Sequence, residues 1–244
     1  MKKKTLVSML LVAAIAVQSM TVFAAKSPDS DDSGSSSGSS STSTVTVSKD
    51  GTVSTGDTLS STSAGGSTIA VVVDTTTATG TPITVNEKGE AIVGDHTISF
   101  ANGSAATAGL PEETVDTIGR INNGEPLSSI ITGLDLTKSQ AIQDGKVVGL
   151  STAPQMDLTG YYALTGTHAI VTKNAATGQV MDTPTETVIY VPNLVDGLNE
   201  VSVLYYDNAT GRWLLLPVTK VDPVSKLVYV NVTGSGTLSV IYKK

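Results

Sequence analysis

The side chains that could carry acid, base or nucleophilic chemistry are few in this chain and far apart. The chain has two histidines, His96 and His168, and no cysteine, which excludes cysteine nucleophiles, thiolate metal sites and disulfides. Neither histidine has a second histidine or a carboxylate at metal-ligand spacing, so the sequence predicts no metal site. A polar role at the edge of a strand is favoured for both. A Ser-His-Asp triad stays open, because its members converge in space rather than in sequence.

Carboxylates offer a second route to catalysis, because a pair of acids can hydrolyse a glycosidic bond. The candidates are Glu112, Glu113, Asp116, Glu186 and Glu200. Sugar-cleaving sites also tend to present aromatic rings, and the region around the first three acids has only Phe100. A helix N-terminus explains Glu112 and Glu113 better, since negative charge is favourable in a first helical turn. The sequence therefore predicts no catalytic residue and no cofactor.

Four aromatic residues form the most promising binding candidate. Tyr205, Tyr206, Trp213 and Tyr229 fall in neighbouring predicted hairpins, and alternation along a strand predicts that some of them face outward. Exposed aromatic rings stack on sugars or anchor protein partners. In the alternative interpretation Trp213 fills the core and the tyrosines lie at its rim. We expect a binding face here for a protein or glycan partner.

Composition limits the classes of partner. The 244 residues include 28 Ser and 35 Thr and carry a formal net charge of −7, which disfavours nucleic acid and anionic membrane surfaces. Residues 1–24 have the pattern of a signal peptide, with three lysines, a short apolar run and small residues before the expected cleavage site. Cleavage there would leave a mature charge of −10. The sequence thus predicts an exported protein, secreted or associated with a cell surface, without membrane insertion after cleavage.

The chain divides into three parts after the signal peptide. Residues 25–68 are rich in Ser, Thr and Gly and predict a disordered tether, within which residues 44–53 read as a hairpin with an Asp50-Gly51 turn. Residues 69–153 predict a small α+β segment, with strands at 69–73, 82–85, 91–93 and 97–100. Helices are expected after Pro111 and Pro126, and a capping box at Thr137 predicts a further helical turn.

Residues 154–244 predict an antiparallel β-sandwich. Apolar and alternating runs mark strands at 169–171, 187–191, 201–206, 213–216, 227–232 and 237–242. Short turns rich in Gly, Asn and Asp separate them. Six such strands in about 85 residues are typical of an immunoglobulin-like sandwich, here without a cysteine pair. The fold class expected for the whole chain is mainly β, or α+β overall: a small sheet with short helices followed by this sandwich.

The last 55 or so residues carry a pattern in which a strand, an acidic-Gly turn, a Trp and a Pro-containing strand follow one another. It runs from Tyr190-Val191-Pro192 through the turn Asp207-Asn208-Ala209-Thr210-Gly211, then Trp213, and on to Leu216-Pro217-Val218. This pattern resembles the terminal hairpins of immunoglobulin-like modules in bacterial secreted and surface proteins. The resemblance implies an accessory, non-catalytic extracellular module and transfers no functional residue.

These observations together predict a secreted, non-catalytic interaction module that binds a protein or glycan partner. Two alternatives from other classes remain. One is a secreted hydrolase whose site is assembled in space from dispersed residues. The other is a structural subunit of a surface assembly.

Overall fold

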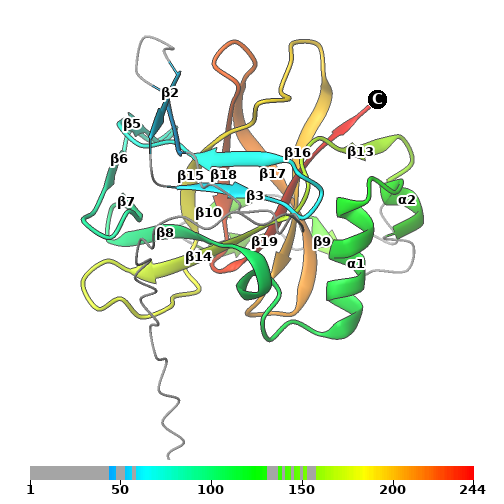
Figure 1. The fold of residues 1–244 in the computed structure, drawn as a ribbon, viewed down its shortest axis with the longest axis horizontal. Coiled ribbons are helices and arrows are strands. Elements are labelled where there is room, and N and C mark those ends of the chain that lie inside the picture. Colours follow the sequence, from blue (N-terminus) through cyan, green and yellow to red (C-terminus); the bar gives the residue numbers. More distant parts are fainter. Residues whose placement is uncertain are drawn as a thin grey trace, which may run out of the picture. The chain divides into compact units, whose positions relative to one another are not determined.

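The computed structural model describes residues 59–130 and 158–244 in full, together with the backbone of short strands within 44–56 and 137–152 (Figure 1). The predicted signal peptide, most of the predicted tether and the predicted boundary between residues 153 and 154 lie outside the described residues. Over the described residues the fold is mainly β, as expected, with a large curled antiparallel sheet and two short α-helices. The predicted hairpin near residue 50 is confirmed, since Val47 pairs with Val53.

The strands before residue 131 are β1 (Thr44–Val47), β2 (Val53–Gly56), β3 (Ser60–Thr62), β4 (Thr68–Val71), β5 (Thr75–Thr76), β6 (Pro82–Val85), β7 (Ala91–Val93) and β8 (His96–Ala101). Those after it are β9 (Thr137–Lys138), β10 (Ala141–Gln143), β11 (Lys146–Val148), β12 (Ser151–Thr152), β13 (Tyr161–Ala163), β14 (His168–Asn174), β15 (Thr185–Tyr190), β16 (Asn199–Asp207), β17 (Arg212–Asp222), β18 (Leu227–Val232) and β19 (Gly236–Lys243). The strands predicted before and after residue 131 are therefore present.

The main sheet follows the path β3-β4-β15-β18-β17-β16-β19-β14-β8-β7-β6-β5. Strand β17 turns the sheet: its first half pairs with β16 up to Pro217, and its second half pairs with β18 from Val218 onward, with a register shift between Val218 and Lys220. A proline and a bulge both interrupt a regular ladder, so the strand bends at this point. The curl encloses an apolar core.

That core draws on strands from both halves of the chain. Ile69, Ile83 and Ile98 come from β4, β6 and β8, and they belong to one cluster with Val188 and Leu238 of β15 and β19. All five side chains are fully buried. Neither half therefore encloses this core alone. Strands β4 and β8, which precede residue 154, are integral to the sheet path, so the strands after residue 154 do not form this sheet alone, and an immunoglobulin-like resemblance is not confirmed.

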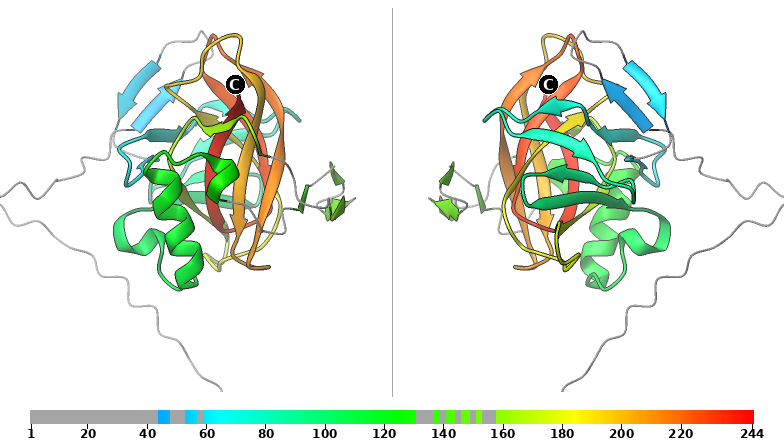
Figure 2. Two further views of the ribbon diagram at one scale, coloured as in Figure 1. Left: turned by 90° about the vertical axis from the view of Figure 1, so that its right-hand side faces the viewer. Right: turned by 90° about the vertical axis from the view of Figure 1, so that its left-hand side faces the viewer.

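The two helices lie beside the sheet (Figure 2). They cover a second apolar cluster there. Helix α1 (Glu112–Asn122) buries Ile118 and Ile121, and α2 (Leu127–Ile130) buries its first and last residues. Their partners on the sheet include Tyr206 and Trp213. The periodic apolar residues after Pro111 thus form the expected helix, which ends at Asn122 before Gly124, where the backbone φ is 73°.

The helical turn predicted after Thr137 is wrong. Thr137 and Lys138 form β9, which pairs in parallel with Leu214 and Leu215 of β17 and antiparallel with β12. A capping box gives a helix only local support. Pairing with the edge of a long strand satisfies the same backbone groups, and tertiary contacts of this kind override local propensity.

The carboxylate of Glu186 joins strands from different ends of the sheet path. Glu186 lies on β15, and its oxygens accept hydrogen bonds from the Ala78 amide at 2.9 Å and the Thr79 hydroxyl at 3.1 Å, in the turn between β5 and β6. We expect Glu186→Ala to lower the free energy of unfolding by about 1–2 kcal/mol, because charge-assisted hydrogen bonds are lost. Amide exchange at Ala78 should accelerate by roughly tenfold or more.

Hydrogen exchange followed by NMR measures this prediction, with Glu87→Ala as the control. Glu87 is an exposed acid in the neighbouring 86–89 turn, so its removal changes the charge equally. An equal effect of the two substitutions on the Ala78 amide would contradict the role of the Glu186 hydrogen bonds.

Candidate functional site

The four aromatic residues proposed from the sequence as a binding face are all buried. Tyr205, Tyr206, Trp213 and Tyr229 are exposed by 0%, 4%, 5% and 8% of their surfaces. The expectation that some of them face outward is therefore wrong. Alternation exposes one face of a strand only where nothing covers that face. Here α1 and α2 cover one face of β16 and β17, and the curled sheet encloses the other.

The contacts of these rings are those of core residues. The Tyr205 hydroxyl donates to the Gly234 carbonyl at 2.7 Å, and burial raises the pKa of that phenol. Tyr206 and Trp213 meet edge to face with ring centroids 5.3 Å apart. Lys220 places its ammonium 5.0 Å from the ring centroid of Tyr229. The Tyr205 hydroxyl thus has an internal partner, and the other rings pack against side chains of the protein itself.

A concave site lies elsewhere, where β3, the end of β8, α1 and the start of β14 meet. It is a pocket of about 300 Å³, at the small end of the range for ligand sites. Its apolar floor includes Ile118 and Ala169. Its polar lining is uncharged and consists of hydroxyl and amide side chains, namely Ser61, Thr62, Ser63, Asn102, Thr107, Asn122 and Thr167. We call it the polar pocket.

Hydrogen bonds fix the walls of the polar pocket. Ser61 donates from Oγ to Asn102 Oδ1 at 3.1 Å, which joins β3 to the residue after β8. Asn122, the last residue of α1, donates from Nδ2 to Thr167 Oγ1 at 2.9 Å and accepts the Thr167 amide at 2.8 Å. Within the fully described ranges, Asn102 Nδ2 and the Thr107 hydroxyl have no hydrogen-bond partner. These groups leave donors and an acceptor for a ligand.

Close backbone approach also shapes this wall. A Cβ on Gly166 would overlap Ser63 Oγ and lie 2.6 Å from Asn122 Oδ1. Only glycine lets the chain before β14 pass beside both side chains. The wall therefore depends on three segments that are distant in the sequence, around residues 63, 122 and 166.

His168 lies behind Ser61, away from the pocket lining. Its Nδ1 is 3.0 Å from Ser61 Oγ, the residue is 1% exposed, and its ring meets Phe100 edge on at 6.5 Å between centroids. Among the described residues Nε2 has no hydrogen-bond partner. Burial lowers the pKa of His168 to about 3, so the imidazole is neutral near pH 7.

This hydrogen-bond pattern determines what the Ser61 and His168 pair can do. Since Ser61 gives its proton to Asn102, the imidazole must donate from Nδ1 to the serine oxygen. A general base needs its lone pair on the serine proton instead. The second nitrogen, which a triad carboxylate would orient, points to no carboxylate in the described ranges. The geometry polarises the serine oxygen weakly and leaves its proton in place.

The other histidine, His96, does not lie beside His168. His96 lies at the opposite end of the β8–β14 pair, where it faces Asn174, whereas His168 lies beyond the Ala101 to Ala169 pairing. Its Nδ1 is 2.7 Å from the carboxylate of the preceding Asp95. The two histidines therefore do not share a site. Across residues 59–130 and 158–244, no three His, Cys, Asp or Glu side chains cluster closely enough to hold a metal ion.

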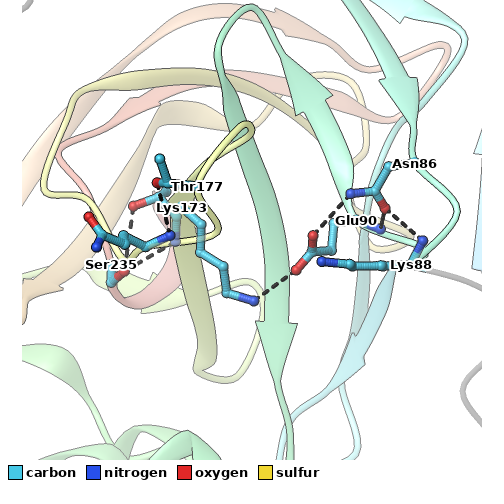
Figure 3. Close-up of polar contacts among 8 residues, drawn as sticks. Asn86, Lys88, Glu90, Lys173, Thr177 and Ser235 are labelled. Carbon is cyan, nitrogen blue, oxygen red and sulfur yellow. Dashed lines mark hydrogen bonds and ion pairs between the residues drawn. The ribbon is translucent and has the colours of Figure 1, made fainter. Parts of the chain in front are cut away.

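A charged cluster on β14 is internally satisfied (Figure 3). Lys173 Nζ lies 2.8 Å from Glu90 Oε1, and Asn86 donates from Nδ2 to the other carboxylate oxygen at 3.0 Å. Hydrogen bonds from Lys173 and Asn86 and the nearby lysine charges, working against partial burial, lower the pKa of Glu90 below its ordinary value. The cluster fastens the 86–90 turn to β14 and pairs the charges of Lys173 and Glu90 with each other.

Comparisons with known proteins add no relative. No family model matches the chain, no curated protein is similar to it, and no solved structure matches its fold. In the part of the chain that the structure describes, none of the helices has both the length and the apolar character needed to cross a bilayer.

Proposed function

We propose that this protein is an exported, non-catalytic binding module whose polar pocket takes one unit of a neutral glycan. The observation that carries the proposal is the lining: seven hydroxyl or amide side chains and no charged one surround a volume of about 300 Å³. A charged ligand would lose its hydration there without gaining a counter-charge. A neutral polyol exchanges hydrogen bonds with water for hydrogen bonds with the wall.

The available groups suit such a ligand. Asn102 Nδ2 and the Thr107 hydroxyl are free to pair with sugar hydroxyls, and Ile118 and Ala169 offer an apolar surface to ring carbons. The hydrogen bonds of Asn122 and Thr167 hold the opposite wall rigid. A preorganised wall lowers the entropy cost of binding.

A glycan array with the mature chain from Ala25 tests the proposal. We expect binding to neutral glycans and not to sialylated or sulfated ones. Ala106→Leu places a larger side chain in the pocket lining and should weaken binding at least about tenfold, which corresponds to roughly 1.4 kcal/mol. The matched control is Ala176→Leu in the exposed 174–178 turn. Binding confined to anionic glycans, or retained in full by Ala106→Leu, would refute the proposal.

The rival function is a hydrolase, and the 3.0 Å contact between Ser61 and His168 favours it. Ser61 is only 2% exposed and gives its proton to Asn102, which argues for binding without turnover. A fluorophosphonate probe, which labels activated serines, distinguishes the two. We expect no labelling. Labelling that disappears in Ser61→Ala would establish the hydrolase instead.

A further inference from the structure

A second pocket lies at the other end of β19, where β13, β16 and β17 come together. Its volume is about 390 Å³. One wall is apolar and consists of Val201, Leu215, Pro217 and Val218, whereas Tyr161, Glu200 and Ser202 form a polar rim. Its lining shares no residue with that of the polar pocket. We call it the Tyr161–Glu200 pocket.

A bulge in β16 sets the position of the carboxylate at the rim. Asn199 pairs with Lys243 and Ser202 pairs with Ile241, so Glu200 and Val201 together oppose the single residue Tyr242. Glu200 has a φ of 42°, a left-handed conformation that costs a non-glycine residue of order 1 kcal/mol. Bulges redirect side chains, and the side chain of Glu200 is 59% exposed.

An ammonium group of the protein itself already lies at this rim. Lys243 Nζ is 3.6 Å from Glu200 Oε2 and 5.6 Å from the ring centroid of Tyr161. The Tyr161 hydroxyl donates to the same carboxylate at 2.5 Å. Partial burial and this carboxylate raise the pKa of Tyr161 to about 12, so the phenol stays protonated and keeps Glu200 in place.

The rim therefore combines a carboxylate and an aromatic ring, which are the two groups that bind organic cations. The apolar wall beside them suits the aliphatic stem of a long cationic side chain. The Lys243 to Glu200 pair is long and exposed, and such pairs contribute little stability. A competing cation can displace Lys243 at low cost.

We propose that the Tyr161–Glu200 pocket binds an arginine or lysine side chain of a partner polypeptide, with its cation at Glu200 and its stem on the apolar wall. Charge complementarity supports a basic partner, because the formal net charge of the chain is −7 and an acidic protein attracts cationic segments over a distance. This site is independent of glycan binding in the polar pocket.

The probe is a capped pentapeptide, acetyl-Gly-Ser-Arg-Ser-Gly-amide, with its Gln counterpart as the neutral comparison. NMR titration of the ¹⁵N-labelled mature chain should show amide shifts at Val201, Ser202 and Val218 with the Arg peptide only. Glu200→Gln should weaken binding at least about fivefold, whereas Glu112→Gln, the same charge change on the exposed start of α1, should not. Lys243→Gln should strengthen binding about twofold to fivefold, because the competing ammonium is gone, and Lys220→Gln should leave it unchanged.

Three results would overturn the proposal. Equal shifts with the Gln peptide would show that the cation is not recognised. Equal affinities of Glu200→Gln and Glu112→Gln, or of Lys243→Gln and Lys220→Gln, would reduce the effect to overall charge. Shifts of the same amides with a neutral oligosaccharide, abolished by Glu200→Gln, would assign the pocket to a hydroxylated ligand. Each outcome leaves the test of the polar pocket by Ala106→Leu unaffected.

Discussion

Gly236→Ala is expected to lower the free energy of unfolding by at least about 3 kcal/mol. Gly236 is a buried residue at the start of β19, opposite Asp207 of β16. A Cβ there would overlap the carbonyl oxygen of Tyr206 and the ring of Tyr205. The first obstacle is backbone of a central strand and the second is a fully buried ring held by its hydrogen bond to Gly234. Neither can move without disturbing the core.

Chemical denaturation measures this prediction, and Gly119→Ala is the matched control. Gly119 lies within α1, and nothing lies within 4 Å of a Cβ placed on it. Alanine in a helix interior is more favourable than glycine, so this control should stabilise the protein by about 0.5–1 kcal/mol. The two substitutions add the same methyl group, but the expected changes in the free energy of unfolding have opposite signs. A loss below about 1 kcal/mol for Gly236→Ala would contradict the packing of Tyr205 described above.

The second large effect is a loss of stability in acid that is due to His168. Burial lowers the pKa of His168 from an ordinary value of 6.5 to about 3 in the folded state. Above pH 6.5 both the folded and the unfolded imidazole are neutral, and the group adds no pH dependence. Between pH 6.5 and 3 only the unfolded chain binds the proton, so stability falls as the pH falls.

The size of this effect follows from proton linkage. From pH 7.5 to pH 5 one histidine of this kind removes about 2 kcal/mol of stability. Carboxylates with a lowered pKa, such as Glu90 and Asp222, add their own loss at lower pH. The window above pH 5 therefore isolates histidine. His168→Asn should abolish most of the loss between pH 7.5 and 5, whatever its effect on stability at pH 7.5.

Urea denaturation at several pH values makes this measurement, with His96→Asn as the control for the other histidine of the chain. We expect the control to keep the acid-dependent loss. An unchanged slope in His168→Asn would show that His168 is not the buried neutral group that its contacts with Ser61 and Phe100 indicate.

The sequence predicted the local elements well, because their signals are local. Alternating and apolar runs located the strands from Ile69 to Tyr242. Pro111 and Asn123 marked the two ends of α1, and the apolar spacing through Ile118 marked its helical period. The helical turn predicted after Thr137 is wrong because Thr137 pairs with β17, a strand that lies more than 70 residues further along the chain. No local pattern reports such a pairing.

The burial of the aromatic residues and the polar pocket escaped prediction for a related reason. The rings of Tyr206 and Trp213 are covered by α1 and α2, about 80 residues earlier in the chain. The pocket brings Ser61, Asn102 and Thr167 together from three distant segments. One signal was present: apolar residues such as Val203, Leu204 and Leu216 occupy both faces of β16 and β17, which is typical of strands covered on both sides.

Calorimetric titration of the chain from Ala25 onward with a neutral oligosaccharide selected on the array tests the central claim most directly. Wild type, Ala106→Leu and Ala176→Leu are compared at the same pH. Binding to the polar pocket predicts saturable heat for wild type and Ala176→Leu, and an affinity at least about tenfold weaker for Ala106→Leu. Equal affinities of all three proteins, or heat with sialylated and sulfated ligands alone, would contradict the assignment of this pocket to a neutral glycan.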